Sequence, residues 1–467
     1  MPGPFSSAGL RLALAVVVFV VLAVAITSRP AKRMVDFDQA FYFTIAYDLD
    51  RHGVFSNGVF DTVDSTRATP PPGMFFAPLY PWLISVAMKI DARFAAAVRC
   101  TIEANERGRG LSRCEIYAWP MLLIHALLLA IGVLAIGRSA ELILGDPRAF
   151  YVAGALATAA VASEAELLSY VMSESTWFCL YGLLMLSVVL ALKTGRGLHF
   201  ALAGLALGVL SLTRASFLIL VPVLPALFAL YAIRAPDGRR PWLRNTATFG
   251  FVLLLTIAPW LARNYTAFGK LAFTEEYGSA ALIERFSYND MSAREFLLAF
   301  PYCLPVVGPA LVNTLAGADA MARFVWETPG SFFERGRAHR TALVAQHGRL
   351  DPIIGDVIRD EMGRNWWRHL LTALPVGWCG MWVSGLWSLI LLPLFAWVCV
   401  AALRRGDPLL LLFAAPALVL VALHAGIASH DTRYNLGLIG PLTAAGTWLV
   451  LRAISSARPK QAAPRLP

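Results

Sequence analysis

The stretch from residue 35 to residue 51, VDFDQAFYFTIAYDLDR, places carboxylates at the start of a run with helical spacing. A carboxylate held beside an alcohol can take the proton as the oxygen attacks, so an aspartate here is a candidate general base. Asp36 and Asp38 also have a structural interpretation. Asp36 with Gln39 three residues later is typical of a capping box, and an acid such as Asp38 is stabilised in a first helical turn.

Three further acids flank a short connection between two apolar segments. Glu164, Glu166 and Glu174 stand at the predicted membrane edge, where an acid is costly and is usually paired or functional. Glu174 follows Ser173, so it could also belong to the first turn of the next helix. Both interpretations of Glu174 stay open at this point.

Three arginines stand at the outer ends of apolar segments. Arg214, Arg263 and Arg433 could each hold a phosphate, because the guanidinium fork matches phosphate oxygens. The alternative is that they reach toward lipid headgroups. His430 and Asp431 lie close to Arg433 in the sequence, but their spacing matches no familiar set of metal ligands. We therefore predict no metal or other cofactor, with a divalent cation as the less favoured alternative.

The composition places these residues in a membrane protein. Of 467 residues, 58% are hydrophobic and 15% charged, whereas a soluble domain carries about 25% charged residues. This composition excludes a soluble enzyme, a disordered chain and a nucleic-acid-binding domain. We expect an all-α polytopic protein of about ten transmembrane helices, at roughly 9–28, 117–137, 149–164, 172–192, 198–213, 216–233, 246–263, 385–403, 408–425 and 436–453. A cleaved signal peptide is the less favoured reading of the first segment, where Ala23-Val24-Ala25 resembles a cleavage site.

The basic residues predict which loops face the cytoplasm. If the N-terminus is cytoplasmic, the loops on that side hold fifteen Lys and Arg residues against four acids, as the positive-inside rule requires. Two long segments, 29–116 and 264–384, then lie on the outer face. The expected organisation is a membrane module over 1–263, an outer helical region over 264–384, transmembrane helices over 385–453 and a cytoplasmic tail over 454–467.

The first outer segment should contain short helices that position its acids. Apolar side chains recur every four residues from Phe41 to Leu49, which is typical of an amphipathic helix on the membrane surface. Residues 76–90 are apolar but too short to span, so we expect a juxtamembrane helix there. Cys100 and Cys114 share this segment, and an outer compartment favours a disulfide between them over two free thiols.

Several short motifs follow one another along the chain. They are Asp38, Tyr42, Ala46, Leu49 and Gly53 after the first span, then Pro78-Leu79-Tyr80-Pro81, Ser173-Glu174, Leu212-Thr213-Arg214, Pro259 and Trp260 with Arg263 and Asn264, and Arg433-Tyr434 before the last span. In this order they resemble the GT-C glycosyltransferases, which use sugars linked to polyprenyl phosphate. That family includes dolichyl-phosphate-mannose protein mannosyltransferases and lipid A aminoarabinose transferases.

The resemblance implies a GT-C-type fold and roles for particular residues. It implies that Asp38 is the general base on the acceptor hydroxyl, that Glu174 belongs to the catalytic group, and that transfer inverts the sugar. The substrate-binding residues that it implies are Asp36, Tyr42, Tyr80, Arg263, Arg433 and Tyr434. Aminoarabinose transferases carry a lysine that meets the lipid phosphate, and Ala77 stands at that position here. We expect Arg433, and after it Arg263, to replace that lysine.

The outer region should determine which acceptor is used. Residues 321–368 mix acids and bases in amphipathic patterns, which indicates a solvated helical cap. An interfacial aromatic belt, with sugar stacking as the alternative, is expected from Trp366, Trp367, Trp378, Trp382 and Trp387.

These features together predict an integral glycosyltransferase of the inner (cytoplasmic) membrane with its site facing the periplasm. The donor would be a sugar on polyprenyl phosphate, and the acceptor an envelope lipid, a glycan or a protein. A transporter or lipid flippase is one alternative, but its ionisable residues are expected near the bilayer midplane and its halves often repeat. A non-catalytic scaffold for envelope assembly is the other.

Overall fold

A computed structural model of the chain describes residues 8–58, 69–106, 114–233, 240–326, 328–406 and 408–456. Throughout these residues the regular secondary structure is helical, with no β-strand. Eight helical segments among them are long and apolar enough to cross a membrane. The chain is therefore an all-α multi-pass membrane protein, which confirms the predicted fold class.

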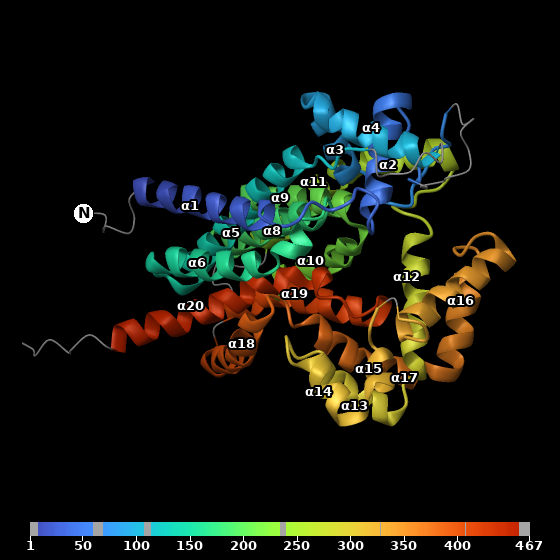
Figure 1. The fold of residues 1–467 in the computed structure, drawn as a ribbon. Helices are drawn as coiled ribbons and strands as arrows, with labels where there is room; N and C mark the ends of the chain where they lie inside the picture. The colour runs from blue at the N-terminus through green and yellow to red at the C-terminus, as the bar shows by residue number, and fades with distance from the viewer. Residues whose placement is uncertain are drawn as a thin grey trace, which may run out of the picture.

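A bundle of nearly parallel helices forms the membrane part (Figure 1). Its long helices are α1 (Ala8–Thr27), α5 (Trp119–Leu144), α8 (Glu174–Thr194), α10 (Leu220–Ala232, after the 3₁₀ segment η3, Ala215–Ile219), α11 (Arg240–Phe268), α18 (Leu386–Arg405), α19 (Pro408–Ile427) and α20 (Ile439–Ser456, after η5, Thr432–Leu438). The other two predicted spans are the shorter apolar helices α6 (Arg148–Ser163) and α9 (Gly197–Thr213). All ten predicted segments are thus helical, and these two pack against the long helices.

Glycine allows two helix pairs in the bundle to approach closely. A Cβ on Gly182 of α8 would lie 3.0 Å from the backbone oxygen of Gly132 on α5, and one on Gly204 of α9 would lie 2.3 Å from that of Phe249 on α11. Small residues are the usual means of close packing in a membrane, where the hydrophobic effect between helices is absent.

The first apolar helix is an integral part of this bundle. α1 packs against α5 and α6, with Val18 and Leu22 buried. Its Arg11 also pairs with Glu141 of α5 at 2.8 Å. These contacts favour a retained span over a cleaved signal peptide.

The first outer segment folds into three short helices at one end of the bundle (Figure 1). They are α2 (Gln39–His52), α3 (Leu79–Ile90) and α4 (Ala92–Glu106). The expected disulfide between Cys100 and Cys114 is present and joins the end of α4 to the chain that leads into α5. The expected helix within residues 76–90 is α3.

Two predictions about α2 are wrong. It is not an open surface helix, because α3 and α4 pack against it and its residues from Gln39 to Asp48, apart from Phe41, are buried. The capping box is also absent at its start. The Gln39 side chain instead donates to the backbone oxygen of Asp36 at 3.0 Å and accepts from the N–H of Val171 at 2.7 Å, so it fastens α2 to the chain before α8.

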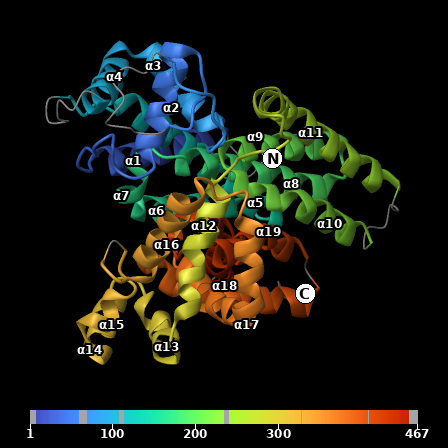
Figure 2. The ribbon, with the colours of Figure 1, turned by 90° about the vertical axis from the view of Figure 1, so that its right-hand side faces the viewer.

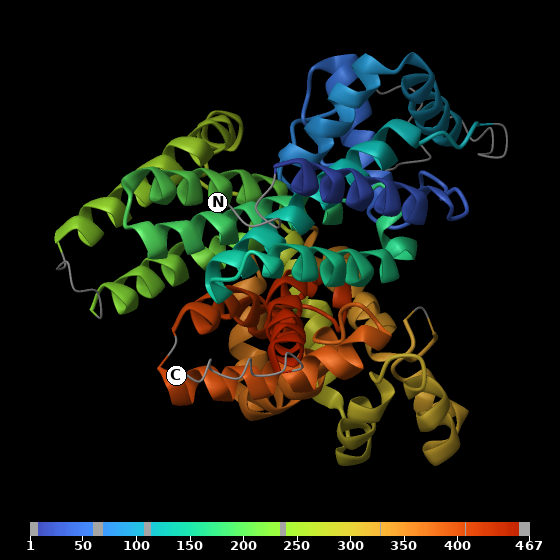
Figure 3. The ribbon, with the colours of Figure 1, turned by 90° about the vertical axis from the view of Figure 1, so that its left-hand side faces the viewer.

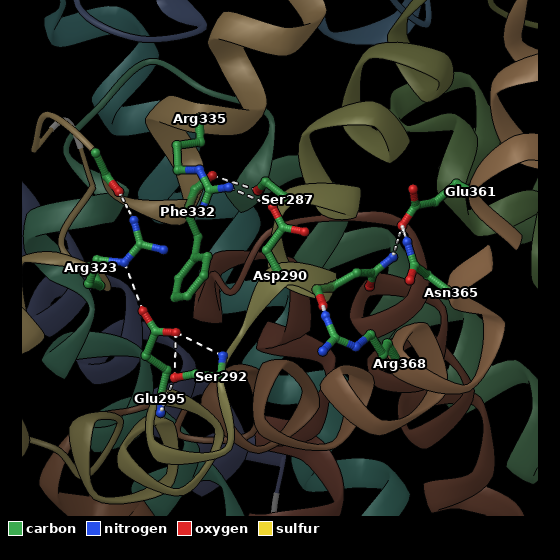
Figure 4. Close-up of polar contacts among 12 residues, drawn as sticks. Ser287, Asp290, Ser292, Glu295, Arg323, Phe332, Arg335, Glu361, Asn365 and Arg368 are labelled. Atoms are coloured by element: carbon green, nitrogen blue, oxygen red, sulfur yellow. Dashed lines mark hydrogen bonds and ion pairs between the residues drawn. The ribbon is translucent and has the colours of Figure 1, made fainter.

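The outer region from residue 277 to residue 380 forms a second helical layer. It contains α12 (Tyr277–Phe286), η4 (Ser287–Asp290), α13 (Ala293–Tyr302), α14 (Gly308–Ala316), α15 (Ala318–Ala322), α16 (Phe332–His347) and α17 (Ile354–Gly380). A capping box of Ser292 and Glu295 starts α13, and the Glu295 carboxylate pairs with Arg323 at 2.8 Å (Figure 4). Cys303 and Cys379 form a second disulfide between the ends of α13 and α17; we did not expect it, because the sequence places Cys379 beside a span.

Both outer segments lie at the same end of the bundle. α1 begins and α20 ends at one end (Figures 1 and 3), while α2–α4 and α12–α17 gather at the other, on opposite sides of it (Figure 2). This arrangement agrees with the predicted alternation of the spans. Of the predicted tail, residues 454–467, only the first three belong to the described chain, as the last turn of α20.

Candidate functional site

Five ionisable side chains meet where the two outer segments approach the bundle, and we call them the charge cluster. Asp38 stands directly before α2, Glu174 is the first residue of α8, and Arg214 lies between α9 and η3. Asp431 and Arg433 stand at the start of η5. Folding therefore brings together residues from both ends and the middle of the sequence.

Arg433 is the centre of the charge cluster. Its Nη1 lies 3.3 Å from Oδ2 of Asp38 and 3.9 Å from Oε1 of Glu174, and its Nε lies 2.9 Å from Oδ2 of Asp431. Asp431 also caps η5, because its Oδ1 accepts from the backbone N–H of Arg433 at 2.9 Å. The turn thus fixes both the backbone and the guanidinium of Arg433.

Glu174 is enclosed between two arginines. Its side chain is 4% exposed, and its Oε1 lies 3.3 Å from Nη1 of Arg214 as well as 3.9 Å from Nη1 of Arg433. Arg214 in turn lies over the ring of Tyr434, 4.8 Å from its centre. Three carboxylates thus face two guanidinium groups, and most of their surface is shielded from water, which strengthens each electrostatic contact.

Tyrosines form a neutral wall around these charges. The Tyr434 hydroxyl accepts from Nη2 of Arg433 at 3.1 Å. Tyr42 is buried, its hydroxyl reaches Oγ of Ser173 at 3.5 Å, and burial with the nearby Asp38 charge raises its pKa. Burial likewise raises the pKa of Tyr277. At neutral pH these hydroxyls therefore keep their protons and can act as hydrogen-bond donors.

Tyr80, one of the predicted substrate-binding residues, lies behind Tyr42. Its side chain is fully buried, its hydroxyl lies 2.9 Å from Nε2 of His125, and its ring packs edge-on against Tyr42 with centroids 5.0 Å apart. Tyr80 is therefore a support behind Tyr42.

Asp36 is also placed differently from our expectation. Its Oδ1 lies 2.9 Å from Nη2 of Arg33, and among the described residues no hydrogen bond or ion pair joins its side chain to the charge cluster. Glu166 likewise pairs elsewhere, with Lys32. Of the acids in this part of the chain, Asp38 and Glu174 are the ones that reach Arg433.

Arg263 lies on the wall of an apolar groove beside the charge cluster. Its Nη1 donates to the backbone oxygen of Gly73 at 2.6 Å and its Nη2 to that of Phe55 at 2.9 Å. The groove has a volume of about 740 Å³ and runs between the end of α2, the start of α3, α9 and α11, where it is lined by Leu49, Phe55, Pro78, Trp82, Leu212, Trp260 and Arg263, among others. One of these lining residues, Leu212, stands two residues before Arg214 in the chain.

Arg214 and Asp431 are the members of the charge cluster that our site prediction omitted. Arg214 was visible in the motif Leu212-Thr213-Arg214, and Asp431 only as a neighbour of Arg433. Among the described residues no group of three or more His, Cys, Asp and Glu side chains is placed to hold a metal ion. The expectation of a metal-free site stays a prediction.

Comparison with known proteins gives one kind of match. No protein-family model matches the chain, and no curated protein sequence does. Among solved structures, the chain is similar to ArnT from Cupriavidus metallidurans, crystallised with undecaprenyl phosphate, at 16% identity and a TM-score of 0.41 over 99% of this chain and 82% of that one. At this TM-score the likeness carries no argument for the site.

Proposed function

We propose that this protein is a GT-C-type glycosyltransferase that moves a sugar from a polyprenyl phosphate to an acceptor hydroxyl at the outer face of the cytoplasmic membrane. The observation that carries this proposal is the contact between Asp38 and Arg433 at 3.3 Å. Motifs far apart in the sequence suggested Asp38 as the base and Arg433 as the phosphate ligand. A reaction that uses both a base and a phosphate-binding cation needs the two residues in one site.

The transfer needs a general base and a cation that stabilises the leaving phosphate, and the charge cluster contains both. Asp38 takes the proton of the acceptor hydroxyl while that oxygen forms a bond to the anomeric carbon. The bond from the anomeric carbon to the phosphate oxygen breaks, and its electron pair stays on the phosphate. Arg433 and Arg214 stabilise the charge that grows there, as prearranged cations do in a site with little water. Attack opposite the leaving phosphate inverts the anomeric centre.

The apolar groove suits the lipid part of such a donor. Its wall is made of aliphatic and aromatic side chains, with Arg263 as the charged one among its lining residues. An isoprenoid chain can pack against such a wall by van der Waals contact, as apolar groups do within a membrane. Because Arg263 already donates to two backbone oxygens, we now place Arg214 ahead of it as the second phosphate ligand.

The location of the charges favours transfer over the two alternatives. A flippase or transporter is expected to place its ionisable groups near the bilayer midplane, whereas the charge cluster lies at helix ends and before α2. A scaffold has no need for a buried carboxylate held against two arginines, an arrangement that costs free energy unless it is used or fully paired.

Donor turnover by the purified protein tests this proposal. The protein in lipid nanodiscs is mixed with a panel of sugars linked to undecaprenyl phosphate and with total envelope lipids as acceptors. Mass spectrometry should show release of undecaprenyl phosphate with at least one donor and a matching glycosylated product. Movement of intact donor across the bilayer without cleavage would instead identify a flippase. If the donor were neither cleaved nor moved, the non-catalytic scaffold would be the remaining alternative.

A further inference from the structure

A second cavity is lined in part by Asp431 of the charge cluster. It has a volume of about 510 Å³, and the residues that matter for its chemistry are Glu164, Tyr302, Trp326, Trp382, His430 and Asp431. These come from the chain after α6, the outer helical region and the segment before η5. The cavity is therefore formed between the bundle and the outer layer.

Asp431 connects this cavity to the proposed chemistry. Its side chain lines the cavity and also lies 2.9 Å from Nε of Arg433, which contacts Asp38. The cavity shares none of its lining residues with the apolar groove. A molecule in this cavity would thus contact a member of the charge cluster without occupying the groove.

Aromatic rings fixed against one another form much of the cavity wall. Both Trp326 and Tyr302 lie edge-on to His430, with ring centroids 6.1 Å apart in each pair. Trp326 also stacks on Phe333 at 4.1 Å. Rings held in this way offer preformed faces to a ligand at little cost in conformational entropy.

The polar groups of the cavity are mainly acceptors, and one of them, Asp431, pairs with Arg433, which is not itself a lining residue. Glu164 accepts from the backbone N–H of Ser384 at 2.7 Å, and burial raises its pKa and that of Asp431. Nδ1 of His430 lies 3.0 Å from the Tyr288 hydroxyl, and burial lowers the His430 pKa to about 4, so this imidazole is neutral at pH 7. No Lys or Arg is among the lining residues, which disfavours a phosphate or another anion as the ligand.

We propose that this cavity binds a glycosyl ring that is neutral or carries an amine. The C–H face of a sugar packs on aromatic rings, whose faces are electron-rich, while its hydroxyl or ammonium hydrogens need carboxylate acceptors. Aromatic walls with a few placed polar groups are the usual form of a small-molecule site. This proposal rests on the proposed function only for the origin of the ring, which belongs either to the acceptor or to the donor sugar.

Binding of simple sugars tests the cavity independently of transfer. Saturation-transfer NMR on the purified protein would use methyl glycosides of glucose, galactose, mannose and glucosamine as probes. We expect binding of at least one probe, weakened roughly five- to tenfold in Trp326→Leu, and also weakened in Glu164→Gln. Trp366→Leu is the matched control, since Trp366 is exposed and lies outside the cavity; equal melting temperatures would show that the variants are folded.

The outcomes separate this proposal from the proposed function. Asp38→Asn should bind the probe as the wild type does, even if it transfers no sugar. Probe binding therefore tests the cavity even if the transfer reaction fails. No binding by the wild type, or equal binding by Trp326→Leu, would overturn the proposal. In a turnover assay, a raised KM for the acceptor in Glu164→Gln would assign the ring to the acceptor, and a raised KM for the donor would assign it to the donor sugar.

Discussion

At the scale of single residues, Arg433 has acidic neighbours on two sides, Asp38 at 3.3 Å and Asp431 at 2.9 Å. A donor phosphate would compete with Asp38 for this guanidinium, while Asp431 keeps its hold through the backbone of η5. Donor binding would then release Asp38 toward the acceptor. In this account Asp38 and Arg433 act together, so the role of either residue does not follow from its own segment of the sequence.

Replacing Arg433 should impair use of the donor. We expect Arg433→Ala to lower turnover by about 10²-fold or more, the usual effect of removing one group that stabilises transition-state charge. Arg433→Lys should recover part of it, because lysine keeps the charge but loses the bidentate fork. The measurement is transfer rate against donor concentration, with Arg452→Ala as the control, since Arg452 is exposed near the other end of α20. Unchanged donor dependence in Arg433→Ala would transfer the phosphate role to Arg214 or Arg263.

The partly buried His430 predicts a loss of stability in acid. Its pKa is about 4 in the folded protein against 6.5 for a free histidine, so the unfolded chain binds its proton first. The free energy of unfolding should fall as the pH drops from about 6.5 toward 4, by about 2 kcal/mol at pH 5.

Melting curves at pH 7 and pH 5 for the wild type and His430→Gln measure that contribution. The raised pKa values of Asp431 and Glu164 act in the opposite direction, but the variant retains both carboxyls, so the difference isolates His430. An equal drop in melting temperature for both proteins would contradict the partly buried, neutral imidazole.

At the scale of elements, the sequence predicted where helices occur better than how they begin and pack. Helices α2 and α3 were expected because apolar residues recur at helical spacing and 76–90 is too short to span. The start of α2 was mispredicted because Gln39 bonds to Val171, more than a hundred residues away. A local capping rule cannot include such a partner. The expected aromatic belt included Trp382, but this side chain is buried and lines the second cavity.

The two disulfides are also contacts between elements, and they predict a simple count of thiols. Cys100–Cys114 and Cys303–Cys379 leave Cys179 and Cys399 free. Alkylation of the denatured protein without reduction should therefore modify two of its six cysteines, and alkylation after reduction should modify all six. Intact-mass analysis gives both numbers. Four modified cysteines without reduction would show that one of the bridges does not form, and peptide mapping would identify it.

At the scale of the whole molecule, hydropathy was sufficient to find the bundle. A membrane requires long apolar helices whose backbone groups are satisfied internally, so the spans are encoded locally and all ten predicted segments are helical. The site is different in kind, because Asp38, Glu174, Arg214 and Arg433 meet only after the spans have assembled. The motif resemblance could name most of these residues, but it could not give the ion pairs that join them or the two cavities beside them.

The sidedness of the bundle predicts which positions a membrane-impermeant thiol reagent can reach. In a variant that lacks the two free cysteines, Arg51→Cys and His339→Cys should be labelled in intact spheroplasts. Arg196→Cys and Arg404→Cys should be labelled only after the membrane is opened, since they stand at the end with the excess of basic residues. All four side chains are exposed, so access depends on the side of the membrane. Labelling of Arg196→Cys in intact spheroplasts would place the charge cluster in the cytoplasm and contradict the proposed function.

The most direct test of the central claim compares two aspartates that stand two residues apart. Asp38 contacts Arg433 in the charge cluster, whereas the Asp36 side chain pairs with Arg33. The measurement is the rate of undecaprenyl phosphate release from the donor in the presence of acceptor, for Asp38→Asn and Asp36→Asn side by side. We predict a loss of at least ~10²-fold for Asp38→Asn, as expected when a general base is removed, and a rate within a few-fold of the wild type for Asp36→Asn. Near-normal turnover by Asp38→Asn, or an equal loss in both variants, would contradict the assignment of Asp38 as the catalytic base.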